Sequence, residues 1–340
     1  MTEAIVFAAL TRYRNSMKEL LEKQQVGIYL ASVVLAMLTA SLLPGTTVFE
    51  NAINPALAVM LFVTFLQVPL ADLGRAFAHA RFLAALLTTN FLAIPFLVVT
   101  MMQFLPSEPL VRLGVLLVLL TPCIDYVVTF SQLGRADARL LLAATPALLV
   151  MQMALLPIYL GLFLGAEAAA LVQPGPFVHA FIWLIAVPLV LAGVMQIWAT
   201  RHWTGQRVGM ALSFLPVPAT ALVLFIVVAS VLPQLGSATE VALIVMPFYI
   251  VFAVLAPLIG WGIAWLFRLD SITGRAVSFS AGTRNSLVVL PLALAVPGAI
   301  PVLPAIVVTQ TLVELMSELI YVRLIARLGR IDHAETRPAP

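Results

Sequence analysis

The sequence predicts an all-α membrane protein in which ten transmembrane helices form two inverted repeats of five. Of the 340 residues, 62% are hydrophobic and only 10% are charged, and the mean hydropathy of +1.09 is far above the range of soluble globular chains. Apolar runs such as 82–104 and 241–267 are long enough for a spanning helix, which needs roughly 20 residues. These runs lack the period-2 alternation of barrel strands, so the sequence favours a helical bundle.

Proline, glycine and charged residues divide the apolar runs into separate spans. Residues 1–25 precede the spans. They do not read as a signal peptide, because no small-residue cleavage site follows an apolar core, and we expect them to form a cytoplasmic segment. We place the spans at 26–43, 54–70, 82–104, 111–133, 138–164, 177–199, 208–232, 241–267, 276–296 and 302–325. The first repeat then covers 26–170 and the second 171–328, and residues 329–340 form a cytoplasmic tail.

The basic residues orient these spans. With both termini in the cytoplasm, all but two of the 18 lysines and arginines fall on the cytoplasmic side, as the positive-inside rule requires. The two exceptions are Arg112 at the outer edge of a span and Arg284 within one. The sequence therefore predicts a multi-pass protein of the cell (inner) membrane with cytoplasmic termini. Its net charge of +3 reflects this topology, and no nucleic-acid partner is expected.

The number of spans itself predicts the inverted repeat. Two sets of five contain an odd number of spans each, so the second half inserts upside down relative to the first. Two pairs of residues recur at one spacing: Pro55 and Pro216 are 161 residues apart, as are Cys123 and Arg284. The polar interruptions of the fourth and ninth spans therefore fall at corresponding positions.

These two interruptions predict the substrate site. The fourth span contains TPCIDY at 121–126, where Pro122 removes a backbone donor, and the ninth contains SAGTRNS at 280–286. Interrupted helices free carbonyls, amides and helix ends that can replace the water shell of a solute. The alternative is a proline kink with a satisfied Arg–Asp pair. The candidate substrate-binding residues are Cys123, Asp125, Thr283, Arg284, Asn285 and Ser286, and the break-forming residues are Pro122 and Gly282.

Two carboxyl groups in the tenth span are candidates for proton coupling. Ionisable side chains at the bilayer centre cost about 2.5–3.5 kcal/mol each, so they usually face a bundle interior or an aqueous cavity. Glu314 lies about midway along the span and is the stronger proton carrier, the alternative being a fixed partner of Arg284. Glu318 lies one turn nearer the cytoplasm, where a salt bridge with Arg323 is expected, and is a secondary candidate.

Four amide side chains and one hydroxyl within the expected spans are further secondary candidates: Gln152, Asn90, Gln67, Gln310 and Thr309. Intramembrane amides are more often interhelical hydrogen-bonding groups than substrate contacts.

The single cysteine, Cys123, excludes a disulfide framework or a cage of several thiolates within one chain. Its position between a proline and an acid favours a functional role over packing, and a thiolate would favour a thiophilic solute. An intramembrane hydrolase would need a paired aspartate, a Ser–His dyad or a zinc motif at membrane depth. The expected spans contain one aspartate and no such motif, so neither an enzyme nor a cofactor is expected.

At these residues the chain resembles the arsenical-resistance permeases, the arsenite efflux branch of the bile acid:sodium symporter superfamily, over nearly all ten spans. The segment TPCIDYVVTFSQLGRADARL is similar to the family's fourth-span signature, in which a cysteine needed for metalloid transport corresponds to Cys123. The segment QTLVELMSELIYV is similar to the last-span motif, whose essential glutamate corresponds to Glu314. SAGTRNSLVVLPLALAV is similar to the unwound ninth-span motif.

The resemblance implies export of arsenite or antimonite in exchange for protons. It also implies a core of crossed helices that moves against a panel formed by the remaining spans, with Cys123 as a transient ligand of the trivalent metalloid. The oligomeric state is left open.

The chain also departs from the family's pattern. Arsenite permeases carry an acid just after the polar pair of the ninth-span motif, whereas Ser286 is followed here by Leu287 and Val288. Sodium-coupled relatives have a glutamate near Ser280 and a glutamine at Arg284. Losing a carboxylate and gaining a guanidinium disfavours Na⁺, so protons are the expected coupling ion. The alternative is an organic-anion symporter in which Arg284 binds a carboxylate or sulfonate and the cysteine only packs.

Overall fold

The structure is a computed structural model that describes residues 2–67, 79–124, 126–169, 175, 178–179, 182–233 and 238–329. Asp125, the tail beyond residue 329 and parts of the expected loops lie outside these ranges. Every regular element within them is helical, as the sequence predicts.

A helix lies at the position of each expected span, although several are interrupted. The first half contains α1 (Thr2–Leu42), the short η1 (Thr46–Phe49), α2 (Glu50–Gln67), α4 (Ala80–Thr88), η3 (Thr89–Ala93), α5 (Ile94–Met102), α6 (Pro109–Leu119), α7 (Val127–Leu133) and α8 (Ala138–Ala169). The second half contains η4 (Ile182–Ala186), α10 (Val187–Arg201), α11 (Trp203–Leu212), α12 (Pro216–Val231), α13 (Thr239–Leu266), α14 (Ser271–Gly282), α15 (Ser286–Leu294), α16 (Val302–Leu324) and η6 (Ile325–Arg327).

The helices identify an integral membrane protein with several spans. In the described ranges, six helices are long and apolar enough to cross a membrane, and a seventh span results if α11 and α12, bent by 44°, are counted together. Large apolar side chains are exposed on the outside, among them Phe96, Phe104 and Trp265. Such side chains suit a lipid surrounding and would be a liability in water. The full count of ten spans stays a prediction.

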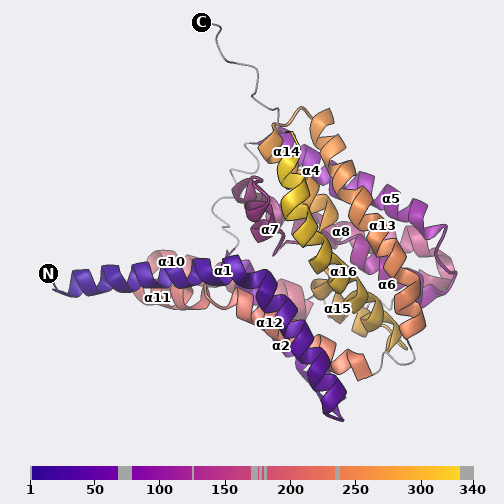
Figure 1. The fold of residues 1–340 in the computed structure, drawn as a ribbon, viewed down its shortest axis with the longest axis horizontal. Coiled ribbons are helices and arrows are strands. Elements are labelled where there is room, and N and C mark those ends of the chain that lie inside the picture. The colour runs from indigo at the N-terminus through magenta and orange to yellow at the C-terminus, as the bar shows by residue number, and fades with distance from the viewer. Residues whose placement is uncertain are drawn as a thin grey trace, which may run out of the picture.

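The helices form two groups, which Figure 1 shows at the lower left and the upper right. We call α1, α2 and α10 to α12 the panel, and α4 to α8 with α13 to α16 the core. In the panel, α1 packs along α12, where Ser32 Oγ donates to the carbonyl oxygen of Ala221 at 2.5 Å. In the core, α13 packs against α14 and α16, and α16 packs against α6 and α15.

Each group contains helices from both halves of the chain. The two expected repeats therefore interlock in space instead of forming two separate bodies. The inverted symmetry that would relate them stays a prediction.

Candidate functional site

Both expected interruptions are present in the core. The fourth span is divided between α6, which ends at Leu119, and α7, which begins at Val127. The ninth span is divided between α14, which ends at Gly282, and α15, which begins at Ser286. The prediction of two broken helices is therefore confirmed in the described residues.

The two breaks meet and pair through their backbones. The amide N–H of Cys123 donates to the carbonyl oxygen of Thr283 at 3.1 Å, and that of Asn285 donates to Thr121 at 2.9 Å. Together they form an isolated antiparallel bridge between Pro122 and Arg284. We call residues 121–124 and 283–286 the crossing. The breaks thus satisfy backbone groups that would otherwise be costly inside a membrane.

The pairing of the breaks also bears on the inverted repeat. The two hydrogen bonds are related by a local two-fold axis. Rotation about this axis puts Thr121 in the place of Thr283 and Cys123 in the place of Asn285. This match corresponds to a spacing of 162 residues, one more than the spacing of 161 noted in the sequence. Because any antiparallel bridge has such a local two-fold axis, the pairing agrees with an inverted repeat without requiring one.

Arg284 is fully buried, and its guanidinium is surrounded by oxygen atoms. Nη2 donates to the carbonyl oxygens of Ser280 and Ala281, at 2.5 and 2.8 Å, and to Asn90 Oδ1 at 2.8 Å. Nη1 donates to the carbonyl oxygen of Leu119 at 3.3 Å. A buried guanidinium is costly unless its donors are satisfied, and these contacts provide most of that compensation.

Asn90 has a larger role than the sequence suggested. It lies in η3, a π-helical turn that widens the helix formed by α4 and α5, and such turns are frequent at functional sites. Its Nδ2 donates to Ser280 Oγ and to the carbonyl oxygen of Leu86, each at 3.0 Å. The one signal in the sequence was an amide within an otherwise apolar run. Only the fold shows that this amide contacts the guanidinium.

Glu314 on α16 binds the backbone of the second break. Its Oε2 accepts from the amide N–H of Arg284 at 2.7 Å and from Gln310 Nε2, and its Oε1 accepts from the Tyr126 hydroxyl at 2.5 Å. The sequence offered the alternative that Glu314 is a fixed partner of Arg284. In the structure Glu314 binds the backbone amide of Arg284, whereas the guanidinium donates to other oxygen atoms. Tyr126 was not among the candidates, whereas Gln310 was a secondary one. In the sequence only their positions pointed to the site: Tyr126 directly follows Asp125, and Gln310 precedes Glu314 by one helical turn.

Glu318 is buried beside the crossing, which corrects the expectation of an interfacial salt bridge. Its side chain is fully buried, whereas Arg323 is exposed. Its Oε1 lies 2.5 Å from Thr283 Oγ1. The sequence placed Glu318 by its distance from the cytoplasmic end of the span, but Gly282 at the end of α14 and Thr283 after it lie against this part of α16.

Two of the remaining candidates, Ser286 and Asn285, have hydrogen bonds of their own. Ser286 Oγ lies 2.8 Å from Thr311 Oγ1, and Asn285 Oδ1 accepts from the Val288 amide at 3.3 Å. Gln152 is buried on α8, and no described contact joins it to the crossing. Asp125 cannot be placed among these groups, because it lies outside the described residues.

Gly282 ends α14 where three helices come close together. A Cβ atom at this position would lie 2.8 Å from Pro257 Cγ and 2.8 Å from Tyr321 Cε2. The glycine is therefore required for the close approach of α14 to α13 and α16. This supports its expected part in shaping the break.

The crossing is closed in this conformation. The space beside it, lined by Gly282, Gln310, Glu314 and Ser317 among others, measures about 10 Å³, which is room for about one water molecule. A solute could reach Cys123, which is fully buried, only after helices move.

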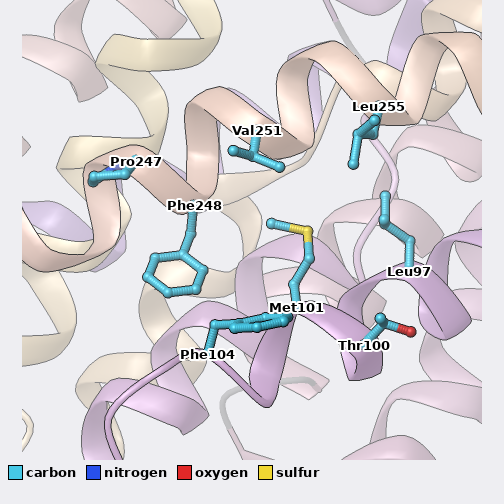
Figure 2. A pocket seen from close by; sticks show the side chains of 8 residues that line it. All are labelled: Leu97, Thr100, Met101, Phe104, Pro247, Phe248, Val251 and Leu255. Carbon is cyan, nitrogen blue, oxygen red and sulfur yellow. The ribbon is translucent and has the colours of Figure 1, made fainter.

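A larger space of about 340 Å³ lies away from the crossing, between α5 and α13. Figure 2 shows Met101, Phe104 and Phe248 around it. The hydroxyl of Thr100, also in its lining, donates to the carbonyl oxygen of Phe96 at 2.9 Å. This space therefore offers apolar contacts to lipid chains and is poorly suited to binding a polar solute.

A multi-pass membrane protein with two discontinuous helices meeting in its core has the architecture of a secondary transporter. Residues 54–240 match the family model described as the sodium bile acid symporter family, and the chain belongs to this family. No curated protein matches the chain. The protein is therefore a membrane transporter of the bile acid:sodium symporter kind.

The matched region contains the first break and Asn90 but ends before the second break and α16. The match consequently supports the superfamily, while the arsenical-resistance branch rests on the resemblance described above.

Proposed function

We propose that this protein exports arsenite or antimonite across the inner membrane in exchange for protons. The observation that carries the proposal is the crossing, where the only cysteine of the chain lies buried at the meeting point of two broken helices. A soft sulfur donor at such a point suits a thiophilic solute.

The chemistry at Cys123 needs no cofactor. When the thiol meets neutral As(OH)₃, an S–As bond forms, and the thiol proton and one hydroxide of the solute leave together as water. On release, water breaks the S–As bond and restores both the thiol and As(OH)₃. A single sulfur ligand keeps this bond readily reversible, which a transport cycle requires.

The surroundings of Arg284 support protons as the coupling ion. Four oxygen atoms, from Asn90, Leu119, Ser280 and Ala281, accept from its guanidinium. Oxygen atoms are also what Na⁺ would need, and a fixed positive charge among them repels a second cation. We propose that the protons are exchanged through a carboxyl group of α16, which carries Glu314 and Glu318.

Access to the closed crossing requires the core to move against the panel. The two groups meet near the site, where the ring of Tyr29 on α1 contacts the ring of Tyr126 with centroids 6.5 Å apart. Tyr126 also donates to Glu314, so one side chain connects the carboxyl group that binds the second break to the panel. This connection would let changes at the crossing influence the movement.

The second candidate is an organic-anion symporter, which the family membership favours. Among the described contacts, Nε of Arg284 has no hydrogen-bond partner and could donate to an anion. Both terminal nitrogens of the same group, however, already donate to oxygen atoms of the core. An anion would therefore have to displace these contacts, which makes this candidate the weaker one.

Arsenite accumulation in cells that lack their own arsenic pumps tests the proposal. Cells with the intact protein should hold less arsenite than cells with an empty vector, and Cys123→Ser should abolish this difference. Thr145→Val is a matched control, because Thr145 is also buried in the core but its hydroxyl donates only to Leu141 of its own helix. Equal protection by Cys123→Ser, or none by the intact protein when it is present in the membrane, would contradict arsenite export.

A further inference from the structure

The two carboxyl groups of α16 have different surroundings. Glu314 accepts hydrogen bonds at both oxygens, from the Tyr126 hydroxyl, the Arg284 amide and Gln310. Amide N–H groups can only donate, and they donate best to an ionised carboxylate. The surroundings of Glu314 therefore suit a permanent anion.

Glu318 is at least as deeply buried and has far fewer partners. Its Oε1 contacts Thr283 Oγ1 at 2.5 Å, and its Oε2 has no hydrogen-bond partner in the described part of the chain. A buried carboxylate with an oxygen left unpaired is much more costly than the neutral acid. The surroundings of Glu318 therefore suit a carboxyl group that holds a proton.

The position of Thr283 agrees with this assignment. Its Oγ1 lies 2.7 Å from the carbonyl oxygen of Phe279 and 2.5 Å from Glu318 Oε1, but the hydroxyl has only one proton to donate. The Phe279 carbonyl can only accept, so the hydroxyl proton of Thr283 goes to it. A protonated Glu318 can then donate to Thr283 Oγ1, and both contacts are hydrogen bonds. The corresponding hydroxyl at Glu314, that of Tyr126, lies 2.5 Å from the carboxylate but 3.3 Å from its second acceptor, the Arg284 carbonyl. Tyr126 can thus donate to an ionised Glu314.

Among the described residues, no cation pairs with Glu318. The guanidinium of Arg284 donates to Asn90 and to backbone carbonyls, and Glu314, one turn away, is an acid as well. The other titratable groups of α16 and of the described elements packed against it are Tyr321, Arg323, Tyr249, Glu240, Cys123, Tyr126, Arg112, Arg275 and Arg327. Arg112, Arg323 and Arg327 lie near helix ends, and Arg275 lies in the first half of α14, whereas the crossing follows the end of that helix. Ionising Glu318 would therefore add a second negative charge beside Glu314.

We propose that Glu318 takes up and releases the exchanged proton, while Glu314 stays ionised and holds the second break through the Arg284 amide. This inference rests on the proposed exchange of a metalloid for protons. In each cycle only one O–H bond of Glu318 forms and breaks, with the proton taken from water on one side of the membrane and returned to water on the other. It assigns the proton to the residue that the sequence ranked second.

Reconstituted protein separates the two roles. Glu318→Gln imitates the neutral acid, so arsenite counterflow without a gradient should stay within about twofold of the intact protein. Arsenite transport driven by an imposed pH gradient should fall at least about tenfold, and the pH profile should flatten. Glu314→Gln should lose both activities, because it removes the anion that binds the break.

A second pair of variants covers the case in which Glu318→Gln does not fold. Thr283→Val removes the hydroxyl next to Glu318 and should shift the pH at which counterflow is half-maximal, whereas Thr283→Ser keeps the hydroxyl and should leave it unchanged.

Gradient-driven transport by Glu318→Gln at the level of the intact protein would overturn the assignment, as would retained counterflow with lost coupling in Glu314→Gln. An unchanged pH profile in Thr283→Val would also count against it. If the intact protein shows neither counterflow nor gradient-driven transport of arsenite, the export proposal itself fails. Loss of the Glu318 assignment alone leaves that proposal standing.

Discussion

The core and the panel are both helical and apolar, but they differ in what they bury. Among the residues whose burial the structure describes, the buried charged side chains Arg275, Arg284, Glu314 and Glu318 all belong to the core. The described buried polar residues of the panel are uncharged, such as Thr64 on α2 and Thr220 on α12. Because buried charges in a membrane are costly, their restriction to the core indicates that selection for function acts there. The panel then provides a surface against which the core moves.

Replacing Arg284 should give the largest effect. Arg284→Met removes the positive charge but leaves Glu314 and the carbonyl oxygens around it, and breaking a buried charge network in this way costs about 3–5 kcal/mol of unfolding free energy. Arsenite transport should be lost as well. Thermal unfolding of the purified protein, with transport in vesicles, measures both effects.

Arg284→Lys is the matched variant for this prediction. A lysine keeps the charge but cannot reach Asn90 and the carbonyl oxygens of two helices at once, so its stability should fall between the other two proteins. If Arg284→Met unfolds at the same temperature as the intact protein, the guanidinium does not hold the core together as we argue.

Two glycine substitutions should have effects of intermediate size, and they compare the core directly with the panel. Gly282→Ala in the core places a Cβ atom 2.8 Å from Pro257 and Tyr321, and such overpacking costs about 1–3 kcal/mol. Gly27→Ala in the panel meets no atom within 4 Å, and in a helix it should stabilise by up to about 1 kcal/mol. Unfolding temperatures should therefore move in opposite directions, and a shift of the same sign in both would contradict the packing described for α14.

The smallest effect is expected for a hydrogen bond of the panel. Ser32→Ala removes the contact between α1 and the Ala221 carbonyl, which should cost about 0.5–1.5 kcal/mol and leave arsenite transport within about twofold. Unfolding and transport assays on the same preparation test this. A transport defect as large as that of Arg284→Met would mean that the panel takes part in the site.

Much of the fold and part of the site could be predicted from the sequence. The apolar runs predict helices in a membrane because hydropathy acts over each segment alone, and the interruptions follow from Pro122 and from the polar run around Arg284. These properties depend on neighbours in the chain. The broken helices are accordingly found where the sequence places them.

The partners within the site could not be predicted in this way. Asn90 and Arg284 are 194 residues apart, and Tyr126 and Glu314 are 188 apart, so nothing local indicates that they meet. The burial of Glu318 likewise depends on contacts from outside α16, such as that of Thr283, which follows the end of α14 and is 35 residues away in the chain. The sequence by itself determined a helical membrane protein with two breaks and buried charges. Only the tertiary structure decided which oxygen each donor meets, because that depends on how helices distant in the chain pack together.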